Sequence, residues 1–337
     1  MWVYAMPESI DDQINRYLVD TISAERNFET ALKTFGQAGE QTPVQRLMTS
    51  ASAKARTQHQ RLEALLKSRG GTPSEAKTVL AEMLAFTPLS AQAGQGAAEK
   101  NTQHLIVTFA AAAAEMAMYE SLATAGAAGG AEDVVSLART LQGEERDDYD
   151  QVWSILRSSA ADSFQAEIEK GKTAQEVLLA YLEDVIAAEK SFETQLLSFS
   201  KEASNLTVRS LFQQHAEETK DQYERLTRRL EELGGSTSTL KGILAQMFGV
   251  APKLAQLGHD KLERETQNLM MAFSVENAEI AMYESLLEAC SVAGDDRTAE
   301  IAGGIQQQER DTAKKVWEQI APAASHAISG LQAESAA

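Results

Sequence analysis

The sequence is poor in cysteine, proline and aromatic residues. A single cysteine, Cys290, cannot form a disulfide within the chain, which excludes a fold held together by disulfides. Only 6 residues are proline and 6% are aromatic, so the sequence has few of the aromatic residues that favour strands and few of the prolines that favour turns. Ala, Glu, Gln, Leu, Lys and Arg are abundant instead. The composition therefore predicts an all-α fold.

Positive charge and long apolar runs are also scarce. The 31 basic side chains are outnumbered by 49 acidic ones, and the net charge of −18 repels nucleic acid. The longest apolar run, Leu105 to Ala114, is too short to span a bilayer. No basic segment followed by an apolar run opens the chain. We expect a cytoplasmic protein with no nucleic-acid partner and no membrane partner.

An internal repeat organises the chain. A shift of 164 residues aligns Glu25 with Glu189 inside a shared Ala-Glu-x-x-Phe-Glu-Thr motif. The same shift aligns the AMYESL stretch that starts at Ala117 with the one that starts at Ala281, without a gap. One offset over so long a block indicates a duplication, and 337 residues are enough for two domains.

Start and stop signals divide each copy into four long helices. In chain order these signals are Ser9-x-x-Asp12, Thr42-Pro43, Gly70-Gly71, Thr173-x-x-Glu176 and Gly234-Gly235. A short extra helix is expected between helices 2 and 3 of each copy, before Pro88 and Pro252. The sequence thus predicts two tandem four-helix bundles, at residues 9–158 and 173–321.

The ends of the two copies are expected to be irregular. We predict that the fourth helix of each copy ends near Leu156 or Ile320. Residues 160–172 would then link the copies, and the Ala- and Ser-rich end after Pro322 would fray.

Acidic residues interrupt the apolar faces of the helices in the second copy. Apolar residues recur at steps of three and four, and this periodicity places the interrupting acids and one histidine on the inner faces. The set is Glu189, His215, Glu218, Glu276, Glu279 and Glu309. Burying such charges costs several kcal/mol per ion unless protons, basic side chains or bound cations compensate.

Bound metal is the compensation that this set of residues favours. Carboxylates clustered with a histidine inside a helical bundle are the ligands of di-iron and di-manganese proteins, so the set predicts a site for two iron or manganese ions. The usual Glu-x-x-His spacing is absent, because His215-x-x-Glu218 runs in the reverse order. One glutamate on a helix is more often solvated than a ligand. The prediction therefore depends on the common level of these residues across four helices.

The first copy lacks half of the set. It keeps three acids, Glu25, Glu115 and Glu145. The other positions hold Ala51, Lys54 and Ala112 in place of His215, Glu218 and Glu276. We expect a buried cluster in which the Lys54 ammonium neutralises the glutamates in place of a metal. The first bundle is then a degenerate partner that serves as a scaffold.

Three stretches of the second copy match a known family. They are Ala187-Ala188-Glu189-Lys190, His215 to Leu226, and Val275 to Tyr283. In them the chain resembles the YciE/YciF family of bacterial ferritin-like stress proteins. The resemblance implies a rubrerythrin-like bundle, a dinuclear metal site at these glutamates and a role in stress response. Lys220 and Asn277 stand where the family pattern has histidines. Because family members are similar to single bundles that pair, the tandem copy implies an internal pseudo-dimer, with further homo-oligomers left open.

Two functions of different classes remain open. In the first, the second bundle binds two iron or manganese ions and has an oxidase-like or peroxidase-like activity toward dioxygen or peroxide. In the second, the protein is a non-catalytic helical scaffold or binding module whose buried acids are relics. Metal uptake distinguishes the two functions.

Overall fold

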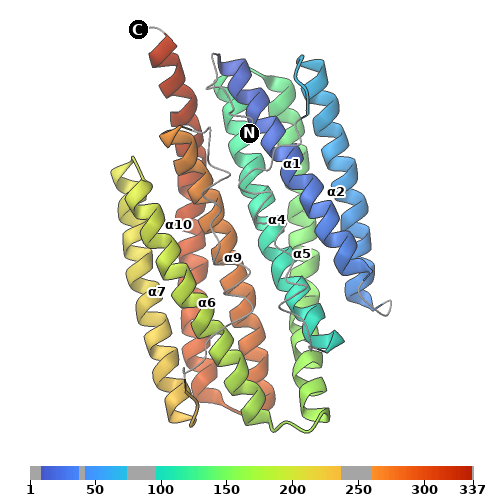
Figure 1. Cartoon of the computed structure of the whole chain (residues 1–337), viewed down its shortest axis with the longest axis vertical. Coiled ribbons are helices and arrows are strands. Elements are labelled where there is room, and N and C mark those ends of the chain that lie inside the picture. Colours follow the sequence, from blue (N-terminus) through green and yellow to red (C-terminus); the bar gives the residue numbers. More distant parts are fainter. Residues whose placement is uncertain (1–8, 38–41, 74–95, 237–259, 336–337) are drawn as a thin grey trace, which may run out of the picture.

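The computed structural model describes residues 9–37, 42–73, 96–236 and 260–335, which form eight helices and no strand (Figure 1). The first bundle contains α1 (Ile10–Gly36), α2 (Pro43–Ser68), α4 (Ala97–Ala128) and α5 (Glu132–Glu169). The second contains α6 (Ala174–Glu202), α7 (Leu206–Glu232), α9 (Lys261–Ala293) and α10 (Asp296–Ser335). The prediction of an all-α chain with two tandem helical bundles is confirmed. The short extra helices predicted before Pro88 and Pro252 lie outside the described residues.

The helices begin and end at the predicted signals. The Thr173 hydroxyl accepts a hydrogen bond from the Glu176 N–H at 3.2 Å, and the Glu176 carboxylate accepts one from the Thr173 N–H at 2.7 Å. Thr42 forms the same kind of capping box with Gln45. After α7, Gly234 has a φ of 83°, a left-handed conformation that glycine adopts without strain. Local sequence therefore fixes these helix boundaries.

The fourth helix of each bundle is longer than predicted. α5 continues to Glu169 and α10 continues through Pro322 to Ser335, so the expected linker at 160–172 and the expected frayed end are both wrong. Each extension packs on the opposite bundle. Phe164 is fully buried with its ring centroid 6.1 Å from that of Tyr181, and Ile328 is fully buried in a cluster with residues of α1 and α4. This apolar burial keeps the segments helical, and in α10 it outweighs the hydrogen bond lost at Pro322.

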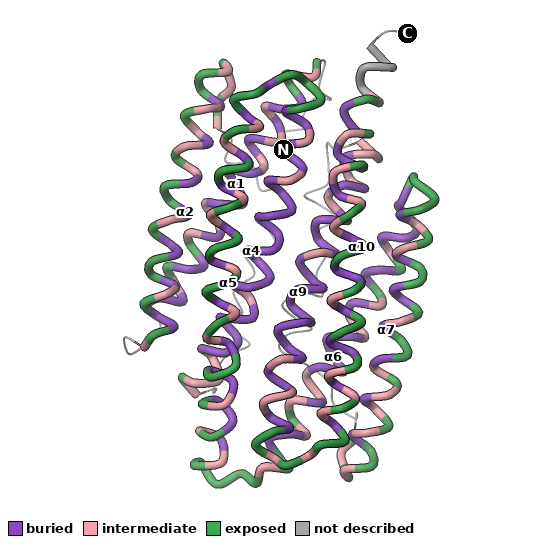
Figure 2. The backbone as a smooth tube through the Cα atoms, turned by 180° about the vertical axis from the view of Figure 1, so that it is seen from behind, coloured by how far each residue is buried: buried purple, intermediate pink, exposed green. Residues whose placement is uncertain are grey.

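The two bundles pack side by side through α4 and α9, the most buried helices (Figure 2). The Ser274 hydroxyl of α9 donates to the Ala110 carbonyl of α4 at 2.8 Å. These two residues correspond to each other in the repeat, so equivalent positions meet at the centre of the contact. Such a contact between equivalent residues is the mark of a two-fold arrangement. The described residues of the two bundles are thus arranged about an approximate two-fold axis.

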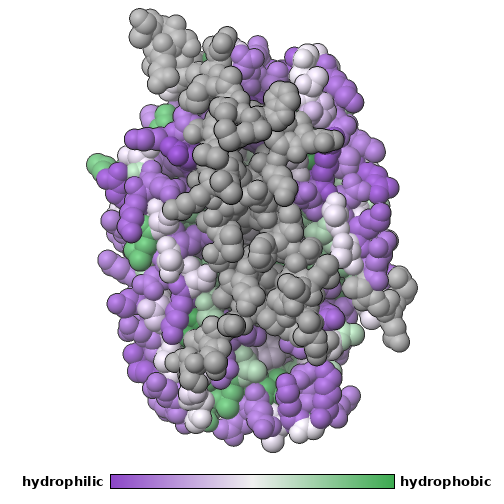
Figure 3. All heavy atoms as spheres, in the orientation of Figure 1, coloured by the Kyte–Doolittle hydropathy of each residue, from purple (hydrophilic) through white to green (hydrophobic). Residues whose placement is uncertain are grey.

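The burial of α4 explains its apolar sequence. By length and composition α4 could cross a membrane, but its most apolar stretch is almost wholly buried inside the molecule, as in the core helix of a soluble protein. Figure 3 shows hydrophilic residues along both flanks of one face of the molecule. Among the described residues, the exposed large apolar side chains are Leu197, Leu206 and Val292.

Candidate metal centre

Four buried side chains of the second bundle converge on one point. They are His215 of α7, Glu276 and Glu279 of α9, and Glu309 of α10. One potential ligand atom from each lies within 4.8 Å of those of the other three, and none of the four residues is more than 2% exposed. Helical periodicity placed these residues on inner faces, and the alignment of the helices in the structure brings them to the same level of the bundle.

His215 bridges two of the carboxylates. Its Nδ1 lies 3.0 Å from Glu276 Oε1, and its Nε2 lies 3.5 Å from Glu309 Oε2. The Gln222 amide donates to Glu309 Oε1 at 2.5 Å and orients that carboxylate. Gln222 was not among the site residues predicted from the sequence, because an uncharged amide on an inner helix face gives no signal of a metal centre.

Glu189 of α6 lies at the edge of the group. It is fully buried and accepts a hydrogen bond from the Tyr283 hydroxyl, while its second oxygen, Oε2, receives none from the described residues. Burial and the nearby Glu309 charge raise the pKa of Glu189 to about 8. Tyr283 thus both fills the core and supports the carboxylate.

Glu218 does not belong to the group of four. It is half-buried, and its Oε2 lies 3.5 Å from the Thr312 hydroxyl of α10. Its role as a ligand stays a prediction.

The electrostatics of the group call for protons or cations. Burial raises the pKa of Glu276 to about 8 even though His215 opposes the shift, and burial with the Glu189 charge raises that of Glu279 well above its usual range. Burial lowers the pKa of His215, but the charges of Glu276 and Glu309 outweigh it and raise that pKa well above 6.5. Neither oxygen of Glu279 has a hydrogen-bond donor among the described residues. Carboxylate oxygens without hydrogen-bond donors, beside a buried imidazole, fit a divalent transition metal.

The first bundle keeps a smaller acidic group. Ligand atoms of Glu25, Glu115 and Glu145 lie within 4.8 Å of one another, and all three residues are buried. The Tyr119 hydroxyl donates to Glu25, and the Gln58 amide donates to Glu145 at 2.5 Å. Tyr119 and Gln58 correspond in the repeat to Tyr283 and Gln222, so both bundles retain the same supporting donors.

Lys54 does not lie among these glutamates, contrary to expectation. Its ammonium is 2.8 Å from Asp148 Oδ1 and donates to the Glu144 carbonyl at 2.6 Å, and its side chain is 28% exposed. Asp148 of α5, which is itself buried, provides a nearer carboxylate, and the repeat alone did not reveal it because its counterpart is Thr312. Burial and the Asp148 charge raise the pKa of Glu145 to about 7, and Lys54 only moderates that shift from a distance.

A comparison with known families agrees with the duplication. The model of the family described as Domain of unknown function (DUF892) matches the chain twice, at residues 10–162 and 173–328. The two matches coincide with the two copies of the repeat, one for each bundle. No solved structure matches the chain. The resemblance to the YciE/YciF proteins stays a prediction beside this match.

Proposed function

We propose, from the premise that this chain belongs to the DUF892 family and carries two copies of its domain, that the second bundle is a metal centre for two iron or manganese ions. The observation that carries the proposal is the convergence of His215, Glu276, Glu279 and Glu309 from three helices on one buried point. The first bundle serves as the scaffold on which that centre is held.

The charge of the group supports two divalent ions. Glu189, Glu276, Glu279 and Glu309 carry four negative charges when ionised, and all four are fully buried. With a neutral His215 imidazole, two divalent cations balance this charge, whereas one would leave two buried negative charges uncompensated.

Groups behind the ligands orient them for this role. Tyr283 fixes one oxygen of Glu189 and leaves the other toward the interior, and Gln222 does the same for Glu309. Such second contacts restrict the rotation of a ligand and tune its affinity. When bound, two such ions supply Lewis-acid and redox chemistry toward dioxygen or peroxide. An oxidase-like or peroxidase-like activity in a ferritin-like stress protein is therefore the function that we propose.

The raised pKa values favour one alternative. At a pKa of about 8, Glu189 and Glu276 hold protons near neutral pH without any metal. In that case the protein is a non-catalytic helical scaffold or binding module, and its buried acids are relics that protons neutralise.

Metal uptake by matched variants separates the two functions. Wild-type protein purified without chelators is titrated with Fe(II) under anaerobic conditions and analysed for metal content, then exposed to air and followed by ferric absorbance. We expect the Glu279→Gln variant to lose the tightly bound metal. The Glu115→Gln variant changes the equivalent residue of the first bundle and should retain the second bundle's two ions. A wild-type chain that takes up no iron or manganese leaves only the scaffold function.

A further inference from the structure

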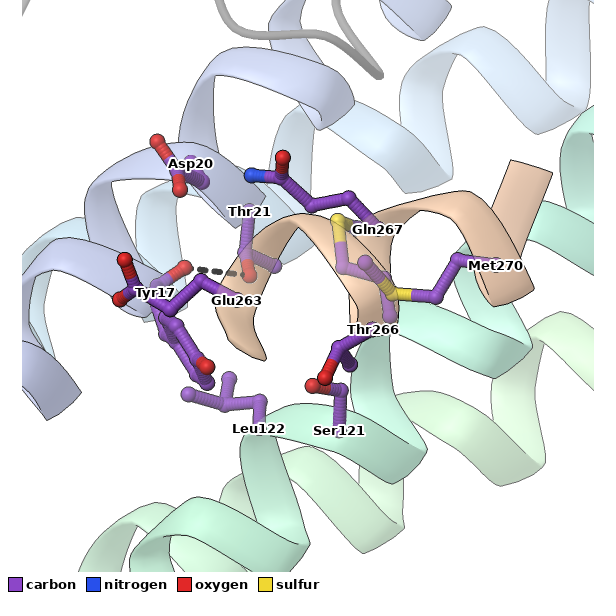
Figure 4. Close-up of a pocket in the computed structure, with 10 residues that line it drawn as sticks. Tyr17, Asp20, Thr21, Ser121, Leu122, Glu263, Thr266, Gln267 and Met270 are labelled. Carbon is purple, nitrogen blue, oxygen red and sulfur yellow. Dashed lines mark hydrogen bonds between the residues drawn. The ribbon is translucent and has the colours of Figure 1, made fainter. Parts of the chain in front are cut away.

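Two cavities lie between the bundles and are related by the repeat. One is lined by residues of α1, α4 and α9, among them Tyr17, Ser121 and Glu263 (Figure 4). Apart from Leu122, every residue that lines it has a counterpart, 164 positions away, that lines the second cavity. Tyr181 and Glu99 are the second cavity's counterparts of Tyr17 and Glu263. The pseudo-two-fold arrangement has therefore built the same pocket twice.

In the first cavity the carboxylate has an internal cationic partner. Glu263 is almost fully buried, and the Arg16 guanidinium of the opposite bundle donates to it. The Gln13 amide donates to the same oxygen at 3.2 Å. The Arg16 side chain is only 5% exposed, so the chain itself fills the space beside this acid with a guanidinium group.

The second cavity has lost that partner and kept the acid. Ala180 stands at the position of Arg16, Val177 stands at the position of Gln13, and both line the cavity. The volume is about 80 Å³, against about 40 Å³ in the first cavity. Among the described residues no cation lies within 4 Å of the Glu99 carboxylate, and burial raises its pKa. The second cavity therefore keeps Glu99, the counterpart of Glu263, but lacks the guanidinium group that Arg16 supplies in the first cavity.

The lysines near Glu99 are engaged by another acid. Lys170 and Lys172 bind the two oxygens of Glu167 at 2.5 and 2.6 Å. Lys172 also lines the cavity and is 51% exposed, so the cavity reaches the surface. Asp184 adds a further carboxylate to the lining.

We propose that the second cavity binds a small guanidinium compound, whose planar group pairs with Glu99 as Arg16 pairs with Glu263. Arg16 donates to a single oxygen of Glu263, Oε1, and the other oxygen accepts the Asp260 N–H at 3.1 Å, so a guanidinium in the second cavity needs only one free oxygen of Glu99. The weak hydration of a guanidinium suits a half-buried site. This site is independent of the metal centre.

Titration calorimetry with methylguanidinium chloride tests the proposal on the full chain. We expect saturable binding at one site in the wild type. Ala180→Arg restores the arginine of the repeat and should abolish binding while raising the melting temperature. Glu99→Gln should weaken binding by about tenfold or more, because a charged hydrogen-bond acceptor is removed. Methylammonium is a compact and more strongly hydrated cation, so it should bind more weakly.

The reciprocal variant is the control. Arg16→Ala empties the first cavity and should create a second methylguanidinium site in addition to the first. The proposal is overturned if the wild type shows no saturable binding of methylguanidinium. It is also overturned if Ala180→Arg folds, as judged by circular dichroism, and still binds the probe, or if methylammonium binds equally well. The Ala180→Arg comparison decides the matter even if Arg16→Ala fails to fold.

Discussion

The two bundles share one set of supporting contacts and differ in the ligands that those contacts hold. Tyr119 and Gln58 orient Glu25 and Glu145 in the first bundle, as their counterparts orient Glu189 and Glu309 in the second. Alanines replace the histidine and one glutamate of the second bundle, so the first group is smaller. The comparison shows that a duplicated core can lose ligands without losing the frame that positioned them.

Introducing the missing ligands into the first bundle should have the largest effect, because it removes the difference between the two bundles. In the Ala51→His, Ala112→Glu double variant the first bundle regains the donors that it lacks, on a backbone that already orients the rest. We expect the iron or manganese content per chain to rise by the amount that the second bundle binds, as measured by elemental analysis. The Ala51→Gln, Ala112→Gln variant adds polar bulk without such ligands and should show no gain. Unchanged metal content in the grafted variant would mean that the frames are not equivalent.

The metal-free protein should lose stability as the pH rises. The pKa values of Glu189 and Glu276 are raised from 4.5 to about 8 in the folded state, so folded protein binds more protons than unfolded protein in this range. The stability contributed by these two protonated carboxyl groups is fully present below pH 4.5, and it is lost as the pH rises through 8. At ~1.4 kcal/mol per pKa unit the loss should reach roughly several kcal/mol.

Urea unfolding between pH 5 and 8, with and without Mn(II), measures this effect. Bound metal replaces the protons, so it should flatten the curve and stabilise the protein most at the highest pH. Stability that increases with pH in the metal-free chain would contradict the raised pKa values. The Glu115→Gln variant removes one buried acid of the first bundle, so it measures how much that bundle contributes to the pH dependence of stability.

The helix extensions should matter to the opposite bundle. Phe164 is fully buried against residues of the second bundle, so Phe164→Ala should cost about 3–5 kcal/mol of unfolding free energy through lost burial and a cavity. Ile328→Ala makes the equivalent change at the other end and should cost about 2–5 kcal/mol. Denaturant unfolding measures both. A cost below about 1 kcal/mol at either site would mean that the extension is not part of the folded core.

The supporting donors should have the smallest effect. Tyr283→Phe removes the hydroxyl that fixes Glu189 and should weaken metal binding by about 10–100-fold without abolishing it. Tyr119→Phe makes the same change in the first bundle and should leave the second bundle's affinity unchanged. Competition with a metal-sensitive chelator provides the measurement, and equal losses in both variants would rule out a local orienting role.

Much of this architecture could be predicted because its signals are local or periodic. Capping residues and glycines fixed helix ends, and steps of three and four placed His215, Glu276, Glu279 and Glu309 on inner faces. The common level of these residues followed from the aligned helices. Glu218 lies on the same helix face as His215 but is only half-buried. The sequence of its helix alone could not distinguish a core-facing acid from one at the edge of the bundle.

Contacts between elements distant in sequence could not be predicted. The partner of Lys54 is Asp148, whose counterpart in the repeat is uncharged, so alignment of the two copies gave no hint of the pair. The length of α5 and α10 depends on burial against the other bundle, which a reading of one copy at a time does not include. Pro322 suggested a helix end, but α10 continues through it because the residues on both sides are buried, which outweighs the lost backbone hydrogen bond.

The contact of Ser274 with its own counterpart Ala110 shows what a covalent link between two halves permits. In a dimer of identical chains every substitution appears at both sides of the axis, so a change that suits one side is imposed on the other. Joining the halves through the few residues between α5 and α6 removes that constraint. Arg16 can then face Glu263 on one side while Ala180 leaves Glu99 open on the other, and each half can specialise independently.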